Sequence, residues 1–132
     1  MHPAAMQILV KCLGAERVCL ITDAMPGAGL PDGQYTLLNQ DVQVTQGIAR
    51  LADGTLAGST ATMDQCLRNM AGLCGVSLAQ AAHMAATTPA RVLGMDSRLG
   101  ALLPGKQADI VLLSQDLQVK MTIKNGKVIY KE

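Results

Sequence analysis

Leu20-Ile21-Thr22-Asp23-Ala24 is the stretch that decides the fold of this 132-residue chain. Together with Val18 and Cys19 it forms a short apolar run, rich in β-branched residues and too short for a helix. Such a run predicts a strand over about 18–22 that is buried on both faces in a parallel sheet. The next residues hold two prolines and three glycines between Pro26 and Gly33, which predicts a long loop. Asp23 therefore stands at the carboxyl end of a strand, where α/β barrels place catalytic groups, unless it caps a turn.

Composition narrows the classes of protein that need to be considered. The chain has no Phe or Trp, two Tyr and eight Met, so its core is apolar but lacks large aromatic side chains. A net charge of +1 without a basic cluster argues against nucleic-acid and membrane partners. No run of residues is apolar enough to act as a signal peptide or a membrane span. Four scattered cysteines favour a reducing compartment, the cytoplasm; they are Cys12, Cys19, Cys66 and Cys74.

The remaining elements follow from periodicity and from residues that begin or end helices and strands. The sequence predicts a helix from Pro3 that ends at Gly14, a β insertion over about 34–51, and helices over about 61–94. Ser77 with Gln80 predicts a capping box, and Thr88-Pro89 predicts the start of a third short helix. The last third predicts three strands: a buried one at 108–113 and two joined by an Asn125-Gly126 hairpin turn.

Several motifs occur in the order in which a known family has them. They are Leu20–Ala24 (LITDA), Leu30–Gly33, Leu51–Ser59 (LADGTLAGS), Met63-Asp64, Pro89–Arg91 and Gly105–Asp109 (GKQAD). Together they resemble the C-terminal third of the N-acetylglucosamine-6-phosphate deacetylase family, within the metal-dependent amidohydrolase superfamily. The GKxAD segment alone is a superfamily signal, whereas the TDA strand followed by GTLAGS is much more specific.

The resemblance implies an α/β fold that is the C-terminal fragment of a (β/α)8 TIM barrel with a β insertion. Residues 1–98 would be the end of the barrel, with its last strand at about 18–22. Residues 99–132 would supply the C-terminal strands of a small β-sandwich domain. The family is expected to be cytoplasmic and homo-oligomeric, a dimer in the parent enzyme.

The resemblance also implies the site. Asp23 matches the family's catalytic carboxylate, which takes a proton from the attacking water and passes it to the departing amine. Leu56, Ala57 and Gly58 match a segment that lines the binding site for the sugar-phosphate substrate. The alternative for these three residues is a plain connection between a loop and a helix.

A divalent metal, zinc or iron, is implied for the full-length enzyme. His2 and His83 without a clustered acidic partner do not complete the family's His/His/Glu ligand set. We therefore expect no complete metal site in this chain, no retained metal and no activity of the isolated chain, with Asp23 as one weak contact.

Three classes of function remain open from the sequence. The first is a fragment of a deacetylase that hydrolyses N-acetylglucosamine 6-phosphate to glucosamine 6-phosphate and acetate. The second is a fragment of another amidohydrolase, for example a cyclic-amide hydrolase, against which the GTLAGS segment argues. The third is a non-catalytic product, either a truncated remnant or an assembly module.

Overall fold

The computed structural model describes residues 2–132, and the chain divides into two compact units. One unit is formed by the chain up to Leu20 together with Leu67–Glu132, and the other is Ile21–Cys66. Each unit has its own apolar core and its own three-stranded antiparallel sheet. Across residues 2–132 no helix is both long enough and apolar enough to span a bilayer.

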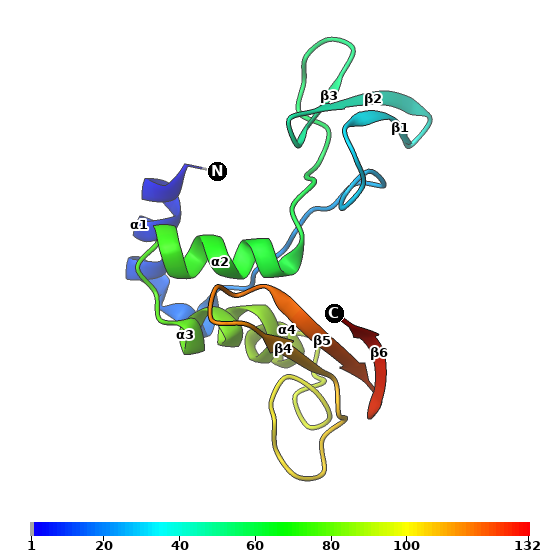
Figure 1. The fold of residues 1–132 in the computed structure, drawn as a ribbon. Helices are drawn as coiled ribbons and strands as arrows, with labels where there is room; N and C mark the ends of the chain where they lie inside the picture. The colour runs from blue at the N-terminus through cyan, green and yellow to red at the C-terminus, as the bar shows by residue number, and fades with distance from the viewer. Residues whose placement is uncertain (1) are drawn as a thin grey trace. The chain divides into compact units, whose positions relative to one another are not determined.

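The first unit is mainly helical (Figure 1). It contains α1 (Pro3–Leu13), the short 3-10 turn η1 (Ala15–Arg17) and most of α2 (Met63–Leu73). The predicted first helix is confirmed: His2 caps it through Nδ1, which accepts the Ala4 N–H, and Gly14 ends it at φ 75°. The core is formed by small and flexible apolar side chains, namely Ala15, Val18, Leu67, Met70, Cys74, Val76, Ala81 and Met84.

The next helical segment is continuous, which corrects one prediction. Helix α3 (Leu78–Ala82) runs into the π-helical turn η2 (His83–Thr87) and then into α4 (Thr88–Val92). The Ser77–Gln80 capping box is present as predicted. Helix α4 begins at Thr88 with Pro89 in its first turn, as predicted, but it is not a separate helix with its own cap, because Thr87 and Thr88 already have helical backbone angles. Pro89 fits in the first turn after the π-helical segment, where the helix does not depend on its missing N–H.

The first unit ends in the sheet β4 (Ile110–Leu113), β5 (Val119–Lys124) and β6 (Lys127–Lys131), paired in that order. The predicted hairpin is confirmed, since Asn125 and Gly126 both have positive φ, as a type I′ turn requires. The prediction that 108–113 is buried is wrong: the strand is shorter, and Val111 and Leu112 are 53% and 47% exposed. Among the described residues this sheet has three strands, so β4 and β6 each have a partner on one side only.

The second unit is built on the meander β1 (Gly33–Leu37), β2 (Gln40–Thr45) and β3 (Ile48–Leu51), within the predicted β insertion. Alternate residues of β2 face the core, so Val42 and Val44 are almost fully buried. Their neighbours in this core are Met25, Ala49 and Ala57. The β2–β3 turn is fixed by Asp32, whose carboxylate accepts the N–H groups of Gln46 and Gly47.

The predicted barrel strand at 18–22 does not form a paired strand here. The N–H of Leu20 donates to the carbonyl oxygen of Met84, and Ile21 is 77% exposed rather than buried. A strand exists only by hydrogen-bonding to at least one neighbouring strand, and no strand pairs with 18–22 among the described residues. Regular pairing begins only beyond Asp23.

Candidate functional site

Asp23 is joined to the segment that follows β3 by a short parallel pairing between Ala24 and Ser59. The N–H of Ser59 donates a 2.8 Å hydrogen bond to the carbonyl oxygen of Asp23. The N–H of Met25 donates a 2.9 Å bond to the carbonyl oxygen of Ser59. These bonds place the backbone of Asp23 against Ser59 and Gly58, at the end of the segment that contains Leu56 and Ala57, and all four sequence-predicted site residues belong to the second unit.

The backbone of Asp23 has an unusual conformation. Its φ is +52°, in the left-handed region that a residue with a side chain seldom occupies. Thr22 stabilises the bend, because its Oγ1 accepts the N–H of Ala24 at 3.3 Å. Asp23 itself is exposed, and its carboxylate has no hydrogen-bond partner among residues 2–132. The side chain that caps this bend is therefore Thr22, and the Asp23 carboxylate is left accessible.

The Leu56–Gly58 segment is held by β3. The N–H of Ala57 donates a 3.0 Å bond to the carbonyl oxygen of Ala49, and Leu56 forms an antiparallel bridge with Arg50. Ala57 is 5% exposed and packs in the core, whereas Leu56 is 64% exposed. The sheet thus anchors the segment through its middle residue and leaves Leu56 and Gly58 exposed beside Asp23.

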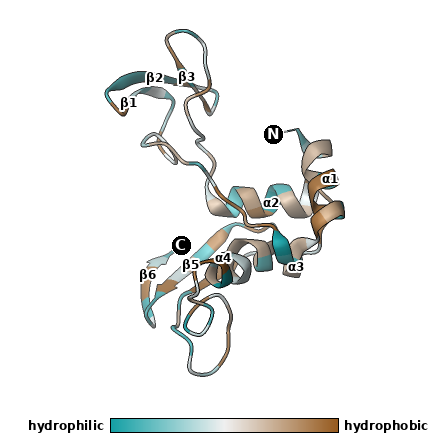
Figure 2. Cartoon of the chain, turned by 180° about the vertical axis from the view of Figure 1, so that it is seen from behind, coloured by the Kyte–Doolittle hydropathy of each residue, from teal (hydrophilic) through white to brown (hydrophobic). Residues whose placement is uncertain are grey.

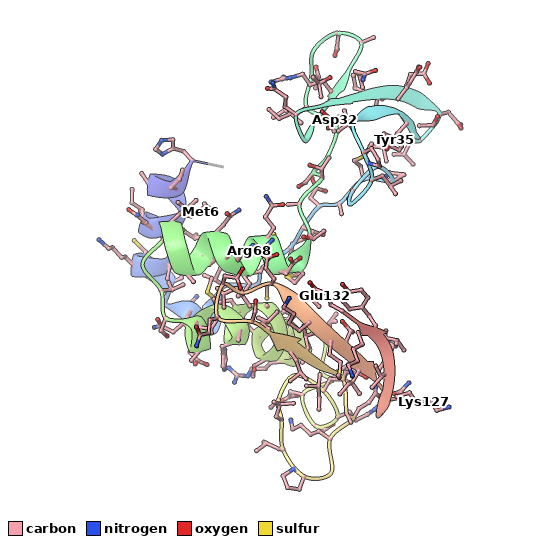
Figure 3. The ribbon with its side chains drawn as sticks, viewed as in Figure 1. Met6, Asp32, Tyr35, Arg68, Lys127 and Glu132 are labelled. Carbon is pink, nitrogen blue, oxygen red and sulfur yellow. The ribbon has the colours of Figure 1, made fainter. Side chains whose placement is uncertain are left out.

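The loop after Asp23 is folded back onto the same sheet. Met25 is buried in the core, and the Tyr35 hydroxyl donates a 2.5 Å bond to the carbonyl oxygen of Pro31. Gly27 lies so close to the Tyr35 ring that an added β-carbon would stand 2.7 Å from it. Figure 3 labels Tyr35 and Asp32, which lie close together in this unit. Tyr35 of β1 therefore contacts this loop both at Gly27 and at Pro31.

The described residues do not fit a metal centre. Among residues 2–132 no three side chains of His, Cys, Asp or Glu gather into a set that could hold a metal ion. Asp53, the acidic residue nearest Leu56 in sequence, has its pKa held below the ordinary value by the backbone N–H of Thr55, which it caps at 2.9 Å. Asp53 is thus a turn residue, whereas Asp23 is joined through its backbone to the end of the Leu56–Gly58 segment and has an exposed side chain.

Three residues of this arrangement were missed by sequence reasoning. Thr22 acts through a local hydrogen bond, Ser59 bonds to the distant Asp23 and Met25, and Met25 packs against Gly58. A threonine hydroxyl often accepts the N–H two residues further on, so Thr22 could have indicated the bend from the sequence. The Ala24–Ser59 pairing had no local signal, because it joins segments far apart in the sequence.

A model of the amidohydrolase family matches residues 16–129, which is most of the chain. The chain belongs to the amidohydrolase family. Among relatives of known sequence, it is 50% identical over 127 residues to the putative N-acetylgalactosamine-6-phosphate deacetylase of Escherichia coli K12. That alignment covers 96% of this chain and 75% of the relative. The N-acetylgalactosamine-6-phosphate deacetylase of Escherichia coli O157:H7 is also 50% identical, with 96% of this chain and 33% of the relative covered.

Other similar proteins are named for N-acetylglucosamine 6-phosphate, the epimer of the galactosamine compound. The N-acetylglucosamine-6-phosphate deacetylase of Vibrio furnissii is 41% identical, with 98% of this chain and 32% of the relative covered. The crystal structure of the enzyme of that name from Thermotoga maritima has a TM-score of 0.92 at 37% identity, over 100% of this chain and 36% of that one. A Mycobacterium smegmatis enzyme, solved as an aspartate-to-alanine mutant in complex with N-acetyl-D-glucosamine 6-phosphate, has a TM-score of 0.90 at 39% identity. It is covered over 34% of its length, against 97% of this chain. This amidohydrolase chain therefore spans about a third of most of these deacetylases.

Proposed function

We propose that this amidohydrolase chain supplies the proton-transfer part of a deacetylase that acts on an N-acetylhexosamine 6-phosphate. The observation that carries the proposal is the backbone pairing of Asp23 with Ser59, which joins a residue with an exposed carboxylate to the end of the Leu56–Gly58 segment. The names of the relatives supply the substrate class. The Mycobacterium smegmatis structure adds support, because N-acetyl-D-glucosamine 6-phosphate is bound there to an enzyme that lacks one aspartate side chain.

In the proposed reaction, water adds to the acetamide carbonyl carbon and the Asp23 carboxylate accepts the proton that this water loses. The tetrahedral intermediate then collapses, and the carbon–nitrogen bond breaks. Asp23 returns its proton to the departing nitrogen, which yields acetate and the free amino sugar phosphate. Leu56, Ala57 and Gly58 line the sugar-phosphate side of the site. No step is assigned to a metal, because the described residues do not form a metal centre.

The two candidate substrates are epimers that differ in the sugar ring. The sequence motifs favour N-acetylglucosamine 6-phosphate as the substrate. The 50% identity to deacetylases named for N-acetylgalactosamine 6-phosphate favours the galacto epimer as a second candidate. Assay of both epimers on the same preparation distinguishes them through the ratio of kcat/KM.

The wider context stays a prediction. It comprises the (β/α)8 barrel, the division into 1–98 and 99–132, a zinc or iron ion in the whole enzyme, a dimeric assembly, a reducing compartment and the inactivity of the isolated chain.

The test uses a complete enzyme in which residues 2–132 replace the matching third of the Escherichia coli O157:H7 deacetylase. Asn keeps the shape of Asp but cannot carry a proton at neutral pH. Asp23→Asn is therefore expected to lower kcat by roughly 10²–10⁴-fold, the usual contribution of a positioned acid–base group. Substrate KM and bound metal are expected to change little.

Asp41→Asn is the matched control, because Asp41 is an exposed carboxylate on β2 of the same unit. It is expected to leave kcat unchanged. If Asp23→Asn also retains near-normal kcat, Asp23 is a turn residue and the proposed proton transfer is wrong.

A further inference from the structure

Gly58 packs directly against the backbone that carries Asp23. A β-carbon added to Gly58 would lie 3.2 Å from the carbonyl oxygen of Asp23 and 3.3 Å from the β-carbon of Met25. Both contacts are tighter than β-carbons normally make, and neither partner can move freely. The Asp23 carbonyl is already bonded to Ser59, and Met25 is 4% exposed in the core.

The same glycine also has a restricted backbone. Its φ is +76°, so a side chain would be unfavourable there even with space around it. Asp23, on the opposite side of the pairing, has φ +52°. Each of these two left-handed residues directly precedes one partner of the Ala24–Ser59 bridge, and only glycine adopts such a conformation without a steric penalty.

We propose that Gly58 is a positioning residue for Asp23: it lets the Leu56–Ser59 segment approach closely enough to hold Asp23 in its left-handed conformation. This inference rests on the proposed function, in which Asp23 transfers the proton. It gives a reason for glycine at this position that differs from close approach to the ligand. The contact shown by the structure is with Asp23 and Met25.

The two explanations separate in steady-state kinetics. If Gly58 positions Asp23, then in the complete chimeric enzyme Gly58→Ala displaces the carboxylate and lowers kcat with little change in KM. A displacement of about 1 Å can cost on the order of 10²-fold in rate, and a fall of this order is the expected result. If glycine serves only to admit the ligand, KM rises and kcat is kept.

Gly54→Ala is the matched control, because Gly54 has φ +85° in the same unit but an added β-carbon meets nothing within 4 Å. It carries a similar backbone penalty without the contact to Asp23. Its kcat is expected to stay near that of the parent. A fall in kcat that is no larger for Gly58→Ala than for Gly54→Ala, or an effect carried by KM, overturns the proposal.

Amide hydrogen exchange supplies a readout that is independent of turnover. In Gly58→Ala the Ser59 N–H, which bonds to Asp23, is expected to lose protection while the amides of β2 and β3 keep theirs. Loss of protection throughout the sheet would mean that Gly58 is needed for the whole unit, which also overturns the proposal. Asp23→Asn is measured in parallel. If Asp23→Asn keeps its kcat, the proposed function fails. If Asp23→Asn loses kcat but Gly58→Ala does not, only the role of Gly58 is refuted.

Discussion

Asp109, at the end of the GKQAD segment, illustrates how a single residue of a family motif can have a structural role. Its Oδ1 accepts the N–H of Asn125 at 2.8 Å, and the carbonyl oxygen of Ala108 accepts the N–H of Gly126 at 2.9 Å. The segment therefore stabilises the β5–β6 hairpin turn through these two hydrogen bonds. Lys106 also has a structural role, since its ammonium group donates a hydrogen bond to the carbonyl oxygen of Asp96. Neither residue belongs to the unit that contains Asp23.

The Asn125 N–H lowers the pKa of the Asp109 carboxyl below its ordinary value of 3.8. A lowered pKa in the folded state means that this interaction stabilises the fold above the unfolded-state pKa. The contribution is lost as the pH falls through the lower, folded-state pKa. Asp109→Ala in the chimeric enzyme is expected to lower the melting temperature at neutral pH, with a difference from the parent that narrows in acid. Melting curves measured between about pH 2 and pH 6 test this, and a pH-independent difference would contradict it.

Among the elements, the π-helical turn η2 is held by a glycine from outside the helix. The hydroxyl of Thr87 donates a 2.6 Å bond to the carbonyl oxygen of Gly100. A β-carbon on Gly100 would lie 2.7 Å from the Ala90 β-carbon and 3.0 Å from the carbonyl oxygen of Ala86. The loop after α4 can therefore close over η2 only without a side chain at this position.

Gly100→Ala is expected to destabilise the fold by about 1–3 kcal/mol through overpacking, in addition to the cost of a left-handed alanine. Gly105→Ala isolates that second cost, because Gly105 has a similar φ of +86° and open space around it. Denaturant unfolding of the two variants in the chimeric enzyme gives the difference. Equal free energies of unfolding would mean that the packing around Gly100 adjusts without cost.

Elements with local signals were predictable from the sequence, and elements that depend on distant partners were not. Gly14 and Asn125-Gly126 mark their helix end and turn correctly, because glycine and asparagine adopt the positive φ that these positions need at little steric cost. The strand at 18–22 was wrong because a parallel strand is defined by neighbours that the described residues do not provide. The candidate site was placed by resemblance, and only the structure gives the Ser59 bonds that assemble it.

For the molecule as a whole, apolar surface remains exposed at the edge strand β6. Val128, Ile129 and Tyr130 are 55%, 63% and 49% exposed, and β6 has a partner on one side only. Helix α1 is also coloured hydrophobic along much of its length in Figure 2, and its Ile8 is 63% exposed. An open edge strand with apolar side chains favours pairing with another chain.

The isolated 132-residue chain is therefore expected to be marginally stable and to associate as its concentration rises. Light scattering coupled to size-exclusion chromatography over a range of concentrations tests this. A Lys substitution at Ile129 is expected to reduce association by placing a charge on the edge strand. A monodisperse monomer with a sharp, reversible melt would contradict the prediction.

The β1–β2–β3 meander also has a consequence for the order in which the site is assembled during folding. Its strands pair only with their sequence neighbours, through two-residue turns at Leu38-Asn39 and Gln46-Gly47 that already have positive φ. Such local hairpins form in about 1–10 μs, whereas contacts between distant segments wait for loop closure. Once the meander has formed, its folded strands shorten the flexible chain between Asp23 and Ser59, which lowers the entropy cost of joining them. We therefore expect the meander to form before the Asp23–Ser59 pairing.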